Sequence, residues 1–128
     1  MSSHRKLRLL THPWRLVVER FDADARPATL LADAPPAGLL AVVRSPDSLT
    51  RVRVLNDGEA GEVWRAIEIA GSFAFTETGV LAAIAGPLAA AGISIFVVNS
   101  YETDFVLVHE EHLERARAVV AAAGHLLV

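Results

Sequence analysis

The chain has 128 residues, with 12 lysines and arginines against 15 aspartates and glutamates and a formal net charge of −3. Because phosphate binding leaves a basic footprint, this balance argues against a nucleic-acid partner. The sequence has no cysteine, which excludes disulfides and thiolate chemistry, and its 52% hydrophobic and 21% charged residues predict a folded protein with a real core.

The apolar runs are too short to cross a membrane. The longest, around residues 80–96, is interrupted by Gly86, Pro87 and Gly92 before it reaches the about 20 residues that a span needs. The basic residues near the N-terminus are not followed by the apolar core of a signal peptide. We therefore expect a cytoplasmic protein with no membrane partner.

The first half of the chain has short strand patterns and little helix. β-branched and aromatic residues predict strands at residues 14–21, 39–44 and 50–55. A short extra strand is expected before them, at residues 7–10. The segment 22–38 is rich in alanine, proline and aspartate, and it has room for one short helix near residues 29–32.

The second half begins with a strand and a helix. Residues 63–70 have the β-branched and aromatic composition of a strand, and apolar residues recur at helical spacing over residues 78–91. Gly92 is placed as the helix stop. Pro87 falls inside this pattern, where it removes a backbone hydrogen bond, so we expect either a kinked helix or two short ones.

A hairpin, a second helix and a last strand follow. Strands are predicted at residues 93–101 and 104–109, a helix at 111–123 and a short strand at 125–128. The resulting order, βαββαβ, is the ferredoxin-like arrangement of an antiparallel sheet with two helices on one face. The predicted fold class is therefore α+β.

The motifs of enzymes and metal sites are missing from the sequence. His109 and His112 stand three residues apart across the end of a strand and the start of a helix, so a solvated helix N-terminus is the default and a metal site the minor alternative. The sequence has no nucleophile motif and no phosphate-binding loop. We therefore expect no catalytic residues, no metal and no cofactor.

Two polar junctions are candidates for ligand binding. At residues 72–81 a strand leads into a helix whose unpaired N–H groups suit a carboxylate; the alternative is that Thr76 or Thr78 simply caps the helix and nothing binds. The hairpin tip at 99–104 is either ordinary turn chemistry or, through Asp104, a site for an ammonium group.

Three ordered motifs carry a resemblance to a known family. They are Thr-Gly-Val-Leu-Ala at residues 78–82, Pro-Leu-Ala-Ala-Ala-Gly-Ile-Ser-Ile-Phe at 87–96 and Ser-Tyr-Glu-Thr-Asp-Phe-Val-Leu-Val at 100–108. With these, the chain resembles the tandem ACT-domain proteins, small regulatory modules related to the amino-acid-binding domains of aspartate kinases and to the cytosolic arginine sensors of animal cells.

The resemblance implies a truncated ACT-like unit at residues 1–60 and a complete ACT domain at 61–128. It also implies that the protein is not an enzyme, that it forms a homodimer and that it binds a small molecule, typically an amino acid, where units or protomers meet. The implied binding residues are Thr78, Gly79, Val80, Ile95, Phe96, Asn99, Ser100 and Asp104. The acidic residue that many ACT domains have in the loop is replaced here by Thr76 and Thr78.

Two functions from different classes follow from this resemblance. The first is a regulatory module that binds an amino acid without catalytic activity. The alternative is an ACT-fold oligomerisation or interaction protein that binds no small ligand.

Overall fold

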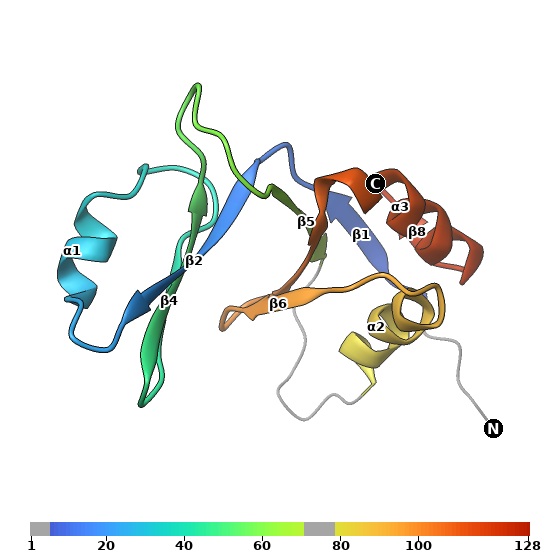
Figure 1. Ribbon diagram of the computed structural model, residues 1–128. Helices are drawn as coiled ribbons and strands as arrows, with labels where there is room; N and C mark the ends of the chain where they lie inside the picture. Colours follow the sequence, from blue (N-terminus) through green and yellow to red (C-terminus); the bar gives the residue numbers. More distant parts are fainter. Residues whose placement is uncertain (1–5, 71–78) are drawn as a thin grey trace. The chain divides into compact units, whose positions relative to one another are not determined.

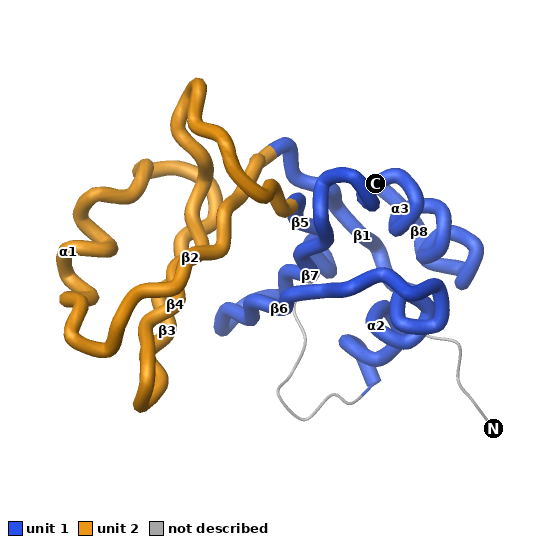
Figure 2. The backbone as a smooth tube through the Cα atoms, in the orientation of Figure 1, with its two compact units in different colours: residues 1–13, 65–128 blue, residues 14–64 orange. Residues whose placement is uncertain are grey.

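Segments from the two ends of the sequence build one unit of the structure. The computed structural model describes residues 6–70 and 79–128. Unit 1 consists of residues 1–13 and 65–128, and unit 2 of residues 14–64 (Figure 2). The division expected from the sequence, at residues 60 and 61, differs from this one chiefly because the N-terminal segment belongs to unit 1.

Unit 2 is a three-stranded antiparallel sheet with one short helix (Figure 1). Its strands follow the order β3-β4-β2, and the helix α1 has proline at its first position, where the missing N–H is no loss. The elements are β2 (Leu16–Asp22), α1 (Pro27–Ala32), β3 (Ala41–Arg44) and β4 (Ser48–Val54). The strands and the short helix predicted for this half are therefore confirmed, with shifted ends.

Unit 1 holds the βαββαβ order predicted for the second half. The elements are β5 (Trp64–Ile69), α2 (Val80–Ala90), β6 (Phe96–Asn99), β7 (Asp104–His109), the 3₁₀ turn η1 (Glu110–His112), α3 (Leu113–Ala122) and β8 (Leu126–Leu127). Only the first residue of β5 falls in unit 2. The helix expected at residues 111–123 thus begins with a 3₁₀ turn.

The N-terminal strand β1 (Arg8–Thr11) changes the sheet of unit 1. It pairs antiparallel with β5 and parallel with β8, so it lies between the first and last strands of the βαββαβ unit. The strand order is β6-β7-β5-β1-β8. The purely antiparallel sheet expected from the sequence is therefore wrong: the sheet is mixed, because a four-residue strand from the chain's start supplies the partner of β8.

The core of unit 1 lies between α2, α3 and one face of the sheet. Alternate strand residues, such as Ile67 and Ile69 of β5 and Val106 and Val108 of β7, form one buried cluster with both helices. Because successive side chains of a strand point to opposite faces, both helices cover the same face. The predicted placement of the two helices is confirmed.

Helix α2 is a single element that contains Pro87, so the alternative of two short helices is wrong. It ends in a Schellman motif, in which the N–H of Gly92 donates to Ala89 O at 3.0 Å and that of Ile93 to Leu88 O at 2.9 Å. Because Ile93 serves this cap, β6 begins only at Phe96, later than the sequence predicted.

Candidate ligand-binding site

Asp104 lies at the start of β7, on the face of the sheet that the helices cover. It pairs in register with Asn99 of β6 and alternates with the buried Val106 and Val108, which belong to the core under the helices. Its side chain is half-buried, and within residues 6–70 and 79–128 its carboxylate has no hydrogen bond or ion pair. Among the described residues, the carboxylate is therefore a half-buried acceptor without a donor.

Helix α2 begins at Gly79, which has the left-handed φ of 81° and provides no side-chain cap. The first helical hydrogen bond runs from the Ala83 N–H to Gly79 O at 3.0 Å. The N–H groups of Val80, Leu81 and Ala82 consequently have no partner inside the helix, and they carry the positive end of its dipole. Thr76 and Thr78, the caps considered from the sequence, lie outside the described residues.

The hairpin turn is attached to the strand that leads to this helix. The hydroxyl of Thr103 donates to Ile69 O, in the last residue of β5, at 2.7 Å. Asp104 is the next residue after Thr103, so it follows directly on the residue that is bonded to the end of β5. Sequence reasoning missed this role of Thr103, since the side chain's partner is distant in the chain.

The structure separates the two apolar residues expected at the site. Ile95 packs against the core of unit 1. Phe96 pairs with Leu107, whose side chain alternates with those of Val106 and Val108, so the Phe96 side chain lies on the face opposite Asp104. The structure therefore does not bring the Phe96 side chain together with the Asp104 carboxylate.

Backbone groups of β6 are directed away from β7 at Val97 and Asn99. The N–H of Ser100 donates to Thr103 O at 2.8 Å, and hydrogen-bonded pairs alternate along an antiparallel ladder. In the observed register the main-chain groups of Phe96 and Val98 then point to β7, and those of Val97 and Asn99 to the outer edge. Asn99 is exposed.

Ser100 is occupied by the turn itself. Its hydroxyl donates to Thr103 O at 3.0 Å and accepts the N–H groups of Thr103 at 3.0 Å and Glu102 at 3.3 Å. Of the two meanings considered for the hairpin tip, turn chemistry therefore accounts for Ser100, while Asp104 is left outside this network.

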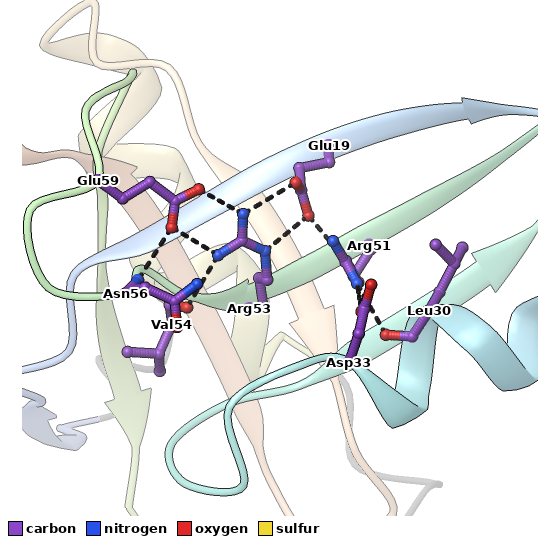
Figure 3. Close-up of polar contacts among 8 residues, drawn as sticks. All are labelled: Glu19, Leu30, Asp33, Arg51, Arg53, Val54, Asn56 and Glu59. Atoms are coloured by element: carbon purple, nitrogen blue, oxygen red, sulfur yellow. Dashed lines mark hydrogen bonds and ion pairs between the residues drawn. The ribbon is translucent and has the colours of Figure 1, made fainter.

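A second polar cluster lies in unit 2 and is closed by its own ion pairs (Figure 3). Glu19 accepts hydrogen bonds from Nε of Arg51 at 2.8 Å and from Nε of Arg53 at 3.0 Å. Both terminal nitrogens of Arg53 also donate to Glu59, at 2.8 and 2.6 Å. Arg51 further bonds Asp33 and, at 2.9 Å, Leu30 O in α1. The two buried guanidinium groups are thus neutralised from within.

The pKa values in this cluster follow from those contacts. Burial raises the pKa of Glu19, but the hydrogen bonds and charges of Arg51 and Arg53 outweigh the effect of burial. The pKa of Glu19 is therefore lower than that of a free glutamate. Hydrogen bonds from Arg53, and from the N–H of Asn56, lower the pKa of Glu59 to about 2. These carboxylates stay charged near neutral pH, which suits a structural role better than ligand exchange.

The two histidines singled out in the sequence approach each other without forming a metal centre. The rings of His109 and His112 lie edge to face with centroids 6.2 Å apart. Within the described part of the chain, no three histidine, aspartate or glutamate side chains are grouped as metal ligands.

None of the helices within residues 6–70 and 79–128 is long and apolar enough to cross a membrane.

Comparison with known proteins bears on the class of the segment that forms most of unit 1. Residues 59–121 match the family model of the ACT domain. The resemblance to ACT domains that the sequence motifs carry is confirmed by this match.

Particular relatives are similar to parts or all of the chain. Human cytosolic arginine sensor for mTORC1 subunit 1 is 42% identical over 59 residues, which are 45% of this chain and 18% of that protein. The chain thus spans under a fifth of that relative's length.

Solved structures match over a larger share of the chain. Protein Atu0741 of Agrobacterium tumefaciens is 29% identical, with a TM-score of 0.81 over 97% of this chain and 93% of its own. The regulatory subunit of aspartate kinase from Thermus thermophilus, 17% identical, matches with a TM-score of 0.62 over 90% and 95% of the two chains. The latter likeness is one of fold.

Proposed function

We propose that this protein is a regulatory module that binds an amino acid and catalyses no reaction. The observation that carries the proposal is the half-buried carboxylate of Asp104, without a partner among the described residues, on the sheet face covered by α2. Names of relatives support it: one is an arginine sensor and another a regulatory subunit of aspartate kinase.

The proposed ligand is a zwitterion with one end for each polar junction. Its carboxylate binds the N–H groups at Gly79 and Val80, where the helix dipole is positive. Its ammonium group binds Asp104, because a buried ammonium needs a carboxylate or several carbonyls to offset its desolvation. Thr78 and the main chain between Ile95 and Ser100 complete the proposed site, with Asn99 beside Asp104.

A thermal-shift screen of the twenty standard L-amino acids, each at about 10 mM, tests the proposal. An amino acid present at a hundredfold excess over its dissociation constant stabilises the fold by about 2.7 kcal/mol, which is readily measured. Asp104→Asn should weaken its binding by about 1.5 to 3 kcal/mol, as expected for the loss of a charge-assisted hydrogen bond. Asp57→Asn, the same change at an exposed turn of unit 2, is the matched control and should bind as the wild type does.

Two outcomes would refute the proposal. One is a screen in which no amino acid shifts the melting temperature of the wild type. The other is equal calorimetric affinity in wild type and Asp104→Asn, which would leave the aspartate with a turn role only.

We also propose that unit 2 is a truncated ACT-like unit. Its order, β2-α1-β3-β4, repeats the first four elements of the βαββαβ unit with a helix of only six residues. A crystal structure of the intact chain tests the repeat, because the strands of residues 14–64 should then superpose on those of residues 64–109. Strands that superpose in a different order would contradict it.

The second candidate function, assembly without a small ligand, is favoured by the edge of β6. Within the described residues β6 pairs only with β7, and the outward main-chain groups of Val97 and Asn99 are available to a strand of another chain. The proposed homodimer is tested by sedimentation equilibrium at tens of micromolar protein, with a mass near twice 13.7 kDa expected. A monomer would remove it.

A further inference from the structure

The turn between β6 and β7 is closed by a compact set of hydrogen bonds around Thr103. The carbonyl of Thr103 accepts both the N–H and the hydroxyl of Ser100, at 2.8 and 3.0 Å, and its own N–H donates to the Ser100 hydroxyl at 3.0 Å. Ser100 therefore holds both main-chain polar groups of Thr103, the residue directly before Asp104.

The side chain of Thr103 fixes this turn to the middle of the sheet. Directly after β5, the N–H of Ala70 donates to Arg8 O at 2.9 Å, and within β5 Ala66 O accepts the N–H of His12 at 3.0 Å. The main-chain groups of the even-numbered residues therefore bond to the β1 side. The carbonyl of Ile69 consequently points to the β7 side. There it accepts the Thr103 hydroxyl at 2.7 Å, so that a side chain closes the end of the ladder.

We infer that Thr103 is the positioning residue for Asp104, an inference that rests on the proposed amino-acid site. Its N–H, its carbonyl and its hydroxyl are all bonded, the last to a different strand. These bonds set the position of the next residue at the end of β5, the strand from which the chain runs to α2. A carboxylate held in this way loses less conformational freedom when it binds a ligand, which raises affinity.

Three variants separate the hydroxyl from the shape of the side chain. Thr103→Val keeps the β-branched shape and loses the hydroxyl, whereas Thr103→Ser keeps the hydroxyl. Thr11→Val is the matched control, because Thr11 ends β1 on the same sheet and its hydroxyl has no hydrogen bond among the described residues. Each protein is screened against the twenty L-amino acids, and calorimetry follows with every amino acid that stabilises the wild type.

The expected result is about a three- to tenfold loss of affinity in Thr103→Val, the range for one neutral hydrogen bond. Thr103→Ser and Thr11→Val should stay within about twofold of the wild type. In an Asp104→Asn background, Thr103→Val should cause no further loss, because Thr103 acts through the carboxylate. A purely structural role would instead lower the stability of Thr103→Val to urea without this dependence on Asp104.

The failures of the two ideas differ. If the wild type binds no amino acid, the proposed function fails and the role of Thr103 falls with it. If the wild type binds an amino acid and Asp104→Asn weakens that binding, the proposed function stands. The positioning role is then overturned if Thr103→Val binds with wild-type affinity. It is also overturned if Thr103→Val lowers the affinity of Asp104→Asn by as much as it lowers that of the wild type. Should Thr103→Val not fold, the same comparison is made with Ser100→Ala, which removes the two hydrogen bonds of the Ser100 hydroxyl to the carbonyl and the N–H of Thr103.

Discussion

His125 donates a hydrogen bond from Nε2 to the carbonyl oxygen of Ala83 at 2.9 Å. The opposite ring nitrogen, Nδ1, accepts the N–H of Leu7 at 3.1 Å, which fixes the proton on Nε2. Ala83 stands four residues before Pro87, so its carbonyl is the one that the proline leaves without a helical partner. The buried histidine therefore completes the hydrogen bonding of α2 at the proline.

Replacing His125 by phenylalanine keeps a ring in the buried position but removes both hydrogen bonds. A buried N–H or carbonyl without a partner costs about 1 to 3 kcal/mol. In a Pro87→Ala background residue 87 regains an N–H that can bond Ala83 O, so His125→Phe should cost about 1 kcal/mol less there than in the wild type. Urea unfolding of the four proteins measures this coupling, and additive effects would contradict the shared role of the Ala83 carbonyl.

Glu59→Gln should reveal an acid-dependent part of the stability. The folded pKa of Glu59, about 2, lies below its unfolded value of 4.5, because Arg53 and the Asn56 N–H bind the charged form. Its contribution is therefore complete above pH 4.5 and is lost as the pH falls toward 2. The stability difference between wild type and Glu59→Gln, from urea midpoints measured between about pH 2 and pH 7, should be largest at neutral pH. A difference that does not change with pH would show that the ion pair contributes nothing.

Arg51→Met should loosen α1. The guanidinium of Arg51 binds both Leu30 O and Asp33 at the end of this helix, and it shares Glu19 with Arg53. A hydrogen bond to a charged group contributes about 1.5 to 3 kcal/mol. Hydrogen exchange should quicken at the amides of Leu30 and Asp33 more than at Val52 in β4. Unchanged protection at α1 would show that apolar packing alone holds the helix.

Gly38→Ala should destabilise the protein more than the same change at Gly58. Both glycines have left-handed φ angles, 74° and 78°, which cost a residue with a Cβ about 1 to 2 kcal/mol. At Gly38 a Cβ would also stand 2.4 Å from Val54 Cγ2, whereas at Gly58 it would meet open space. The added overpacking is worth about 1 to 3 kcal/mol, and equal urea midpoints for the two variants would exclude it.

Elements with strong local patterns were predictable from the sequence, and the pairing of β1 was not. The strand at residues 104–109 has the predicted bounds, because its apolar run is flanked by polar turn residues on one side and a helix start on the other. The sequence predicts a short strand at residues 7–10, which is observed at Arg8–Thr11, but nothing in four residues specifies β5 and β8 as its partners. That choice is made by the buried Leu9 and the core it joins.

The polar residues show the same limit. The alternation of Arg51 and Arg53 on one strand was a signal for a charged face, yet their carboxylate partners lie up to 34 positions away in the chain. The hairpin motif indicated Asp104 and Ser100 as one polar group. It could not show that Ser100 serves the turn and that Thr103 reaches Ile69, because both roles depend on how the hairpin meets β5.

The insertion of β1 between β5 and β8 has a consequence for the order of folding. During synthesis β1 leaves the ribosome before all of unit 2, but its partners are β5 and β8, and β8 follows at residues 126–127. Unit 2 contains its own strands and helix and can form in the interval. The hydrogen bond from the Leu126 N–H to Leu7 O, 2.8 Å long, must then join two segments separated by all of unit 2 and most of unit 1. Closing the sheet of unit 1 is thereby a late, long-range step, the kind that loop-closure entropy slows.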